Sequence, residues 1–320
     1  MPAPSTGREL HIDVPLSNIV VGRRPEGFIA DQLLPVVTVQ KQSNVYWKTA
    51  PKEWNRYESG LTARAPMTEA KKVSFTVSSD TYYAKNYALG AEWPVEDEVN
   101  ADEVLQWATN NANYVMDRLM IDYEMRIATL ATTSANVGTI FVATSGWNSA
   151  ARTAYTDLLT WRDGFKDITG KMPNTLIIPR NVMSKLKVND QFRDILYGDR
   201  GGVVTAQQIA ALLEIPRVLT PTVQVNTAVE VDPQTGTYAD VWAGNGNLWM
   251  GYIDTLGGQF TDTWAQAFRW TSPLFGMPFA VQRYPYDARK KKYDLDVSYY
   301  QDEKIVSSDL MVRVASLTST

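Results

Sequence analysis

The clearest periodicity in the chain predicts one long helix over residues 100–132. Apolar side chains recur there in steps of three and four, which gathers them on one face. Asn100 and Glu103 have the spacing of a capping box at the expected start. The apolar positions are Val104, Leu105, Ala108, Ala112, Val115, Met116, Leu119, Met120, Tyr123, Ile127 and Leu130. We expect a rod of about 46 Å, buried along this stripe.

Residues 45–90 predict a long two-stranded hairpin. Strand-like segments begin at Val45 and at Lys72, the second with period-2 alternation to Val77, and residues 59–66 have the composition of a tip. Each arm of about 12 residues would reach about 40 Å. A compact chain of this length has a radius of gyration of about 20 Å. We therefore expect the hairpin to protrude and, because isolated hairpins are marginal in water, to be supported by another chain.

The N-terminal and C-terminal parts have different patterns. Residues 1–44 predict an extended arm, since five prolines interrupt any helix and 36–39 forms a short strand. The arm is too apolar for a solvated tail, so it should lie against its own domain or a neighbour. Residues 153–270 mix short helices with strands, including a helix from Thr153 to Gly170 and one capped by Thr205. Four later β segments, at 263–270, 279–284, 293–300 and 310–315, should form a sheet under the long helix.

Composition excludes several classes of function. The chain of 320 residues has one His and no Cys, so disulfides, thiolate metal sites and His-based zinc sites are excluded. His11, the remaining candidate base, lies near the N-terminus. With a net charge of −4, the molecule as a whole lacks the excess of positive charge that is typical of nucleic-acid-binding proteins. No apolar stretch is long enough for a membrane helix, and the start lacks the layout of a secretory signal.

Three local motifs invite a chemical interpretation, and each has a simpler one. The glycine-rich segment 198–203 lacks the strand and the Lys of a phosphate-binding loop. The acidic run 92–103 suits the N-terminus of a helix through the helix dipole. The basic cluster 289–292 is flanked by Asp287 and Asp294, which favours a solvated turn over a phosphate contact. We therefore expect no enzyme activity, no catalytic residue, no cofactor and no metal.

Local charge is more informative than the total. Residues 41–72 carry seven basic and three acidic side chains, a sum of +4, whereas residues 92–127 carry two basic and nine acidic ones, a sum of −7. A protruding basic hairpin cannot reach its own acidic helix, so the pattern favours a heterologous contact with an identical neighbour over a merely uneven surface. The interface candidates are Trp47, Lys48, Lys52, Trp54, Arg56, Arg64, Lys71, Lys72, Glu92, Glu96, Asp97, Glu98, Asp102 and Glu103.

The order of these parts resembles the major capsid proteins of tailed bacteriophages, which have the Hong Kong 97-type fold. Four stretches carry the resemblance beyond the order alone: PNTLIIPRNVMSKLKVNDQFRDILYG at 173–198, VVTAQQIAALLEIPRVLTPTVQVN at 203–226, PLFGMPFAVQRYPY at 273–286 and YDLDVSYYQDEKIVSSDLMVRVAS at 293–316. No single motif is diagnostic, but together the similarities extend over nearly the whole chain.

The resemblance implies an α+β fold with four parts. These are an N-terminal arm (1–44), an E-loop hairpin (45–90), a peripheral domain (91–149 and 271–320) with a spine helix at 100–132, and an axial α/β domain (150–270). It also places Asp199, Arg200, Gly201 and Gly202 near the centre of a capsomer.

The implied function is structural. Pentamers and hexamers of the chain would form an icosahedral shell, assembled in the host bacterial cytoplasm, that becomes the capsid of the virion. The shell would enclose double-stranded DNA and contact it non-specifically. Further expected partners are a portal protein, a possible decoration protein and, because the arm begins at once, a separate scaffolding protein. No membrane partner is expected.

Two alternatives stay open. An encapsulin shares the fold and encloses protein cargo instead of DNA. A sugar-binding β-rich protein would use the many Trp and Tyr side chains, but the long helix and the absent signal peptide count against it.

Overall fold

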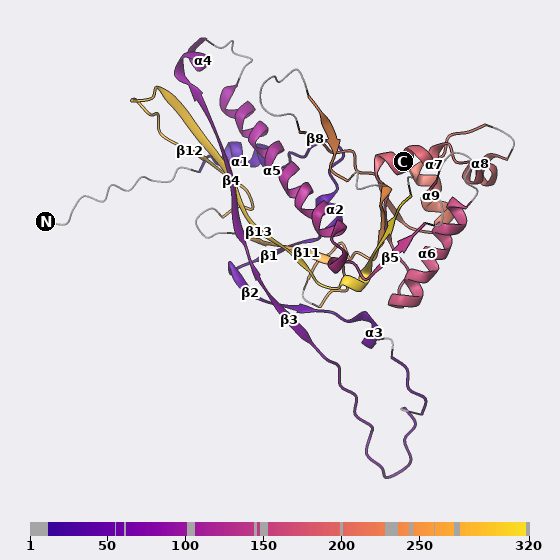
Figure 1. The fold of residues 1–320 in the computed structure, drawn as a ribbon. Helices are drawn as coiled ribbons and strands as arrows, with labels where there is room; N and C mark the ends of the chain where they lie inside the picture. Colours follow the sequence, from indigo (N-terminus) through magenta and orange to yellow (C-terminus); the bar gives the residue numbers. More distant parts are fainter. Residues whose placement is uncertain are drawn as a thin grey trace.

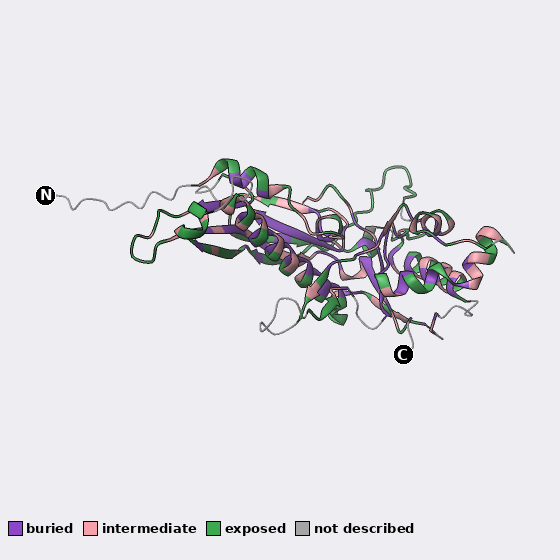
Figure 2. Cartoon of the chain, turned by 90° about the horizontal axis from the view of Figure 1, so that it is seen from above, coloured by how far each residue is buried: buried purple, intermediate pink, exposed green. Residues whose placement is uncertain are grey.

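The computed structural model describes residues 12–54, 56–60, 62–100, 106–143, 146–147, 153–198, 201–227, 236–242, 246–258, 260–271 and 276–317. Two sheets with their helices lie side by side, and a loop projects away from both of them (Figure 1). Buried residues concentrate along the two sheets and the inner faces of the helices (Figure 2). None of the described helices has the length and apolar character needed to cross a membrane.

The first sheet carries the long helix. Its path runs β1-β11-β13-β12, and β4 pairs with the opposite edge of β13. β1 is parallel to β11, and the other pairs are antiparallel. The strands are β1 (Val36–Val39), β4 (Lys85–Pro94), β11 (Ala265–Trp270), β12 (Ala280–Arg283) and β13 (Lys292–Ile305). The strands expected at 36–39, 263–270, 279–284 and 293–300 are thus confirmed.

The long helix, α5 (Trp107–Thr132), has the predicted buried stripe but begins later than predicted. Ala112, Met116, Tyr123 and Ile127 are buried against the first sheet. Asn100 is the last residue of a separate short helix, α4 (Val95–Asn100), and Gln106 is the N-cap of α5. The expected capping box at Asn100 is therefore wrong, and Glu103 lies outside the described residues. With 26 residues, α5 is about 39 Å long.

The described part of the N-terminal arm packs on its own chain. Contrary to prediction, it contains a helix, α1 (Val14–Val21), followed by the short α2 (Ala30–Leu33). Pro15 is tolerated because it occupies the first turn, where no intrahelical N–H bond is needed, and the Asp13 side chain accepts the Leu16 amide at 3.1 Å. Val20 and Leu33 are buried in the α5 core.

The second sheet has the order β5-β14-β10-β6-β7. Its strands are β5 (Thr139–Val142), β6 (Thr175–Ile177), β7 (Arg217–Leu219), β10 (Leu248–Gly251) and β14 (Met311–Ala315), and its helices are α6 (Ala154–Thr169), α7 (Arg180–Lys187), α8 (Asp190–Tyr197) and α9 (Ala206–Leu213). The end of α6 at Gly170 and the N-cap of α9 at Thr205 are as predicted. Gly170 is left-handed, and Thr205 also forms a capping box with Gln208. The last strand, β14, lies here and not under α5, so that expectation is wrong.

A two-stranded ribbon, β8 (Gln224–Asn226) with β9 (Tyr238–Asp240), lies outside both sheets. Two short 3-10 helices lie at Ser134–Asn136 and Ser308–Leu310.

Candidate assembly surfaces

The hairpin has a shorter ladder than the sequence predicts. β2 (Ser43–Lys48) pairs with β3 (Ser78–Tyr83) from Ser43↔Tyr83 to Lys48↔Ser78, and residues 49–77 form a long loop. Residues 72–77 are not paired as a strand, because the opposing segment turns into α3 (Pro51–Trp54) and the Glu53 carboxylate accepts the Thr76 amide at 3.0 Å. The ladder also ends at Tyr83, since the chain from Lys85 belongs to the first sheet.

Aromatic packing fixes the base of the hairpin to the first sheet. The Tyr46 and Tyr82 rings lie 5.2 and 4.6 Å from Phe268 on β11. The Tyr46 hydroxyl donates to the Ile305 carbonyl at 3.1 Å. Lys52 forms an ion pair with Asp309, in the 3-10 helix Ser308–Leu310 that precedes β14, at 2.7 Å. The loop therefore leaves from a rigid base that contacts the first sheet and the 3-10 helix just before β14.

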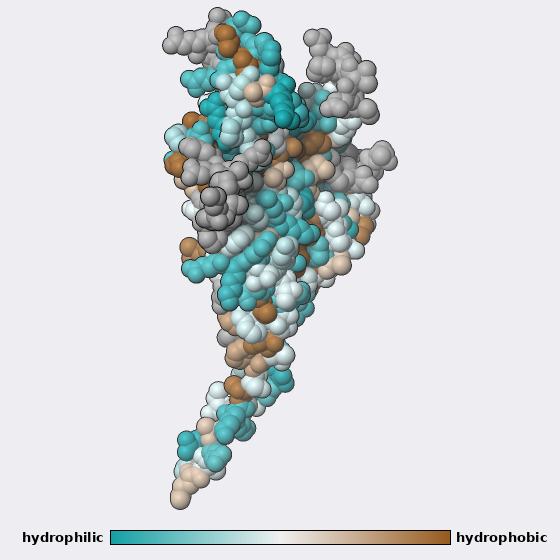
Figure 3. Space-filling model, turned by 90° about the vertical axis from the view of Figure 1, so that its left-hand side faces the viewer, coloured by the Kyte–Doolittle hydropathy of each residue, from teal (hydrophilic) through white to brown (hydrophobic). Residues whose placement is uncertain are grey.

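Beyond this base the loop carries apolar side chains in solvent. It projects as a narrow extension, as predicted (Figures 1 and 3). Val73 is 75% exposed and Phe75 is 61% exposed, and Tyr57 and Met67 are also exposed. Exposed apolar side chains on a protruding segment mark a contact surface.

Several of the predicted interface cations are already paired within the subunit. Lys48 pairs with Asp80 at 2.9 Å and Arg56 with Glu58 at 2.6 Å. The Lys71 ammonium donates to the Gly60 carbonyl at 3.0 Å. Trp47 stacks on Phe260, with ring centroids 5.7 Å apart. The side chain of Trp54 lies outside the described part of the structure.

Two other cations of the loop differ from these. Arg64 and Lys72 are exposed, and they form no ion pair with any described residue. They are the cations of the loop that are best placed to meet an external partner.

The acidic segment is also partly neutralised. Five of its carboxylates have partners in the same chain: Glu92 with Lys292, Glu98 with Arg283, Asp117 with Arg23, Asp122 with Arg126, and Glu124 with the Trp242 indole. Glu96 and Asp97 on α4 are exposed and pair with no described cation. Asp102 and Glu103 lie outside the described residues. Among the described residues of 92–127, the uncompensated negative charge is thus confined to α4, because the other carboxylates have partners in the same chain.

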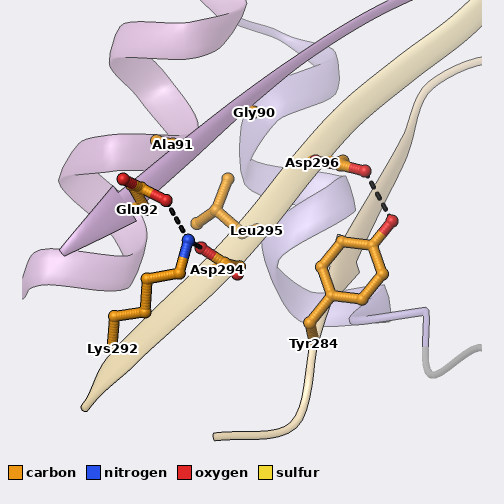
Figure 4. Close-up of a pocket in the computed structure, with 8 residues that line it drawn as sticks. All are labelled: Gly90, Ala91, Glu92, Tyr284, Lys292, Asp294, Leu295 and Asp296. Carbon is orange, nitrogen blue, oxygen red and sulfur yellow. Dashed lines mark hydrogen bonds and ion pairs between the residues drawn. The ribbon is translucent and has the colours of Figure 1, made fainter. Parts of the chain in front are cut away.

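A shallow hollow lies on the outer face of β4 and β13, close to α4 (Figure 4). Lys292 bridges Glu92 and Asp294, and this contact holds the pKa of Glu92 below its ordinary value. Tyr284 donates to Asp296 at 2.6 Å, which raises the pKa of Tyr284 to about 12. Among the described residues, no three His, Cys, Asp or Glu side chains are grouped to hold a metal ion. The hollow is therefore a polar surface of paired charges.

Sequence analysis missed the most unusual charged group, Glu124. This carboxylate, on α5, is fully buried and accepts the Trp242 indole N–H at 2.6 Å and the Ala30 amide at 2.9 Å. It thereby joins three segments that are far apart in sequence. Burial raises its pKa to about 7, although these hydrogen bonds oppose the shift. The available signal in the sequence was an acidic residue directly after Tyr123, which belongs to the predicted buried stripe.

The predicted capsomer-centre loop lies between α8 and α9. Asp199 and Arg200 are outside the described residues, whereas Gly201 and Gly202 are described. The Tyr197 hydroxyl donates to the Val203 carbonyl at 3.1 Å and accepts from the Gln208 amide at 2.8 Å. Gly202 and Val203 thus lie against the Tyr197 side chain.

Gly202→Ala is expected to lower the free energy of unfolding by about 1–3 kcal/mol, because the new methyl would overpack the Tyr197 ring. A Cβ at Gly202 would lie 2.5 Å from two ring carbons. Gly201→Ala is the matched control, since its nearest neighbour is an Arg193 nitrogen at 3.8 Å. Urea denaturation of both variants checks this expectation, and equal stabilities would contradict the close packing.

The comparisons with known proteins agree on one fold. No family model matches the chain. The major capsid protein of Burkholderia phage BcepMu is 22% identical over 283 residues, covering 85% of this chain and 86% of that protein. A phage-related protein from Bordetella bronchiseptica RB50 matches with a TM-score of 0.74 and 20% identity, covering 97% of this chain and 99% of that one.

A third match comes from a structure whose subject is a capsid. The capsid structure of cyanophage P-SCSP1u matches with a TM-score of 0.55 and 12% identity, covering 90% of this chain and 87% of that one. The arrangement of arm, hairpin, long helix and two sheets is therefore shared with phage capsid subunits. The chain has the Hong Kong 97-type fold of tailed-phage major capsid proteins.

Proposed function

We propose that this chain is the structural subunit of an icosahedral phage capsid. The observation that carries the proposal is the loop 49–77, which projects from a rigid base and exposes Val73 and Phe75. A monomer gains nothing from such a loop, because exposed apolar area is unfavourable in water. In a shell the loop would lie on a neighbouring subunit and bury this area.

The proposal includes the finer arrangement implied by the sequence. Pentamers and hexamers of the chain would enclose double-stranded DNA, with the loop between α8 and α9 near the capsomer centre. Arg64 and Lys72 on the loop and Glu96 and Asp97 on α4 are complementary in charge, which supports a contact between neighbours. A portal protein, a scaffolding protein, a possible decoration protein and assembly in the bacterial cytoplasm belong to the same proposal.

Electron microscopy of the purified chain tests this function. We expect capsomers, sheets or closed shells at high protein concentration and moderate salt. A well-folded protein that stays monomeric across salt and concentration would contradict the proposal. Particles isolated from cells distinguish two shell types, since DNA content supports the capsid and protein cargo indicates an encapsulin-type shell.

The burial of most Trp side chains counts against the sugar-binding alternative. Most of the described Trp residues are buried in the two cores, including Trp93, Trp147, Trp242, Trp249 and Trp264. A carbohydrate site needs exposed rings, so the abundance of Trp here reflects packing.

A further inference from the structure

Glu124 lies where three parts of the chain that are distant in sequence meet. It is on α5 and fully buried, and its carboxylate accepts the Trp242 indole N–H at 2.6 Å, the Ala30 amide at 2.9 Å and the Ile29 amide at 3.3 Å. Trp242 follows β9 of the β8–β9 ribbon, whereas Ile29 is the N-cap of α2 in the arm and Ala30 its first residue. A single buried carboxylate thus joins the ribbon and the arm to the long helix.

The arm and the ribbon also touch each other at this place. Gly27, in the turn before α2, has a left-handed φ of +73°, and a Cβ there would lie 1.9 Å from the Thr222 Oγ1. Thr222 precedes β8, and the Val241 amide donates to the Val223 carbonyl at 3.0 Å. The base of the ribbon, residues 222–223 and 241–242, therefore rests on the arm and on α5 together.

Solvent comes close to this joint through a groove. The groove has a volume of about 290 Å³ and lies between the ribbon base, at Val241 and Trp242, and the face of α5 from Met125 to Thr133. The ribbon itself stands outside both sheets, beside α5 (Figure 1). Because the groove has room for several water molecules, a small movement of Trp242 would hydrate the Glu124 carboxylate.

The charged groups around the joint are engaged with one another and not with Glu124. These pairs are Asp31 with Arg24 at 2.8 Å and with Arg269 of β11 at 3.9 Å, and Asp240 with Arg180 of α7 at 2.9 Å. Tyr123, the preceding residue of α5, is buried, which raises the pKa of its hydroxyl. Burial raises the pKa of Glu124 to about 7, and the negative charge of Asp31 adds to this shift. The surroundings therefore favour the protonated form of Glu124 while the joint is closed.

We infer that Glu124 is a pH-sensitive latch that holds the ribbon base and the start of α2 on α5. Loss of its proton favours an open state in which Trp242 and the two α2 amides leave the carboxylate and water reaches it. Both sheets stay folded in this state, because their strand ladders contain no residue of the joint. The closed joint binds the proton more tightly than a hydrated carboxylate does, so opening becomes easier as the pH rises toward 7. The latch belongs to the single subunit and does not depend on the proposed function.

Amide hydrogen exchange of the unassembled chain tests the latch, because it separates local opening from global unfolding. Exchange rates are corrected for the intrinsic pH dependence of amide exchange. In the wild type, we expect the opening constant of the Ile29 and Ala30 amides to rise roughly tenfold per pH unit from pH 5 to pH 7 and then to level off. The amides of β13, in the ladder of the first sheet, should keep their protection over the same range.

Two variants and one control assign the effect to Glu124. Glu124→Gln cannot ionise, so its opening constant should not change with pH. Trp242→Phe keeps a buried ring but removes a donor that lowers the pKa of Glu124, so the levelling-off should move above pH 7. Asp117→Asn is the control, because it removes an exposed carboxylate of α5 that also holds the arm, through Arg23 at 2.8 Å. It should follow the pH profile of the wild type.

A wild-type opening constant that does not change with pH would overturn the latch. An equal loss of protection in β13 would overturn it as well, since the opening would then be global unfolding. If Glu124→Gln does not fold, the direction of the shift in Trp242→Phe decides the matter, and an unshifted profile speaks against the latch. None of these results bears on shell formation, and a chain that forms no particles refutes the proposed function alone.

Discussion

Replacing residues 56–74 with a short Gly-Ser linker is expected to give a folded subunit that forms no shells. The ends of the excised segment lie close together, since the Glu53 carboxylate is 3.0 Å from the Thr76 amide. The three hydrophobic clusters contain no residue from this segment. The β2–β3 ladder and the Lys52–Asp309 ion pair stay in place, so the free energy of unfolding should change by less than about 1 kcal/mol.

Circular dichroism and urea denaturation measure the folding of this variant, and electron microscopy measures its assembly. A second variant keeps the loop at full length but changes Tyr57, Met67, Val73 and Phe75 to Ser. This variant distinguishes the effect of loop length from the effect of the apolar side chains, and we expect it also to lose assembly. Shells formed by the excised variant would show that the loop is no assembly element. If the excised variant is unfolded, the loop contributes to the core, which would contradict the solvent exposure of its side chains.

The part of the fold that follows from local pattern could be predicted from the sequence. The stripe from Ala112 to Ile127 depends only on helical periodicity, and it is buried as expected. The start of α5 could not be predicted, because it depends on tertiary contacts. The Trp107 indole donates to the Asp97 carbonyl at 3.1 Å, which ties the beginning of α5 to a separate helix.

The protrusion of the loop could be predicted from the sequence, but its strand pairing and its local charge could not. Period-2 alternation at 72–77 indicates a strand, but a strand needs a partner, and its own chain offers Glu53 instead. Summed charges overstated the acidity of α5, since a sum along the sequence cannot include ion pairs such as Asp117 with Arg23. Buried polar contacts between distant segments, such as Glu124 with Trp242, are likewise invisible to a local pattern.

Glu124→Ala is expected to lower the free energy of unfolding by about 3 kcal/mol. The change leaves the buried Trp242 indole N–H and the Ala30 amide without an acceptor, and each unsatisfied buried donor costs about 1–3 kcal/mol. The variant also avoids the cost of burying a carboxylate, which offsets part of this loss. Glu124→Gln keeps the volume and one acceptor oxygen, so it should cost less. Glu96→Gln, on the exposed face of α4, is the control and should be neutral.

The same residue should make stability depend on pH. Its pKa is about 7 in the folded chain, above the ordinary value of 4.5, so the folded state binds more protons than the unfolded state between these values. Stability should therefore be highest below pH 4.5 for this group and fall by about 3 kcal/mol as the pH rises to 7, then level off. Urea denaturation at several pH values should show this fall in the wild type and a reduced slope in Glu124→Gln. Identical slopes would mean that the hydrogen bonds from the Trp242 indole and from the Ala30 and Ile29 amides keep Glu124 ionised throughout, because these three donors would then outweigh its burial.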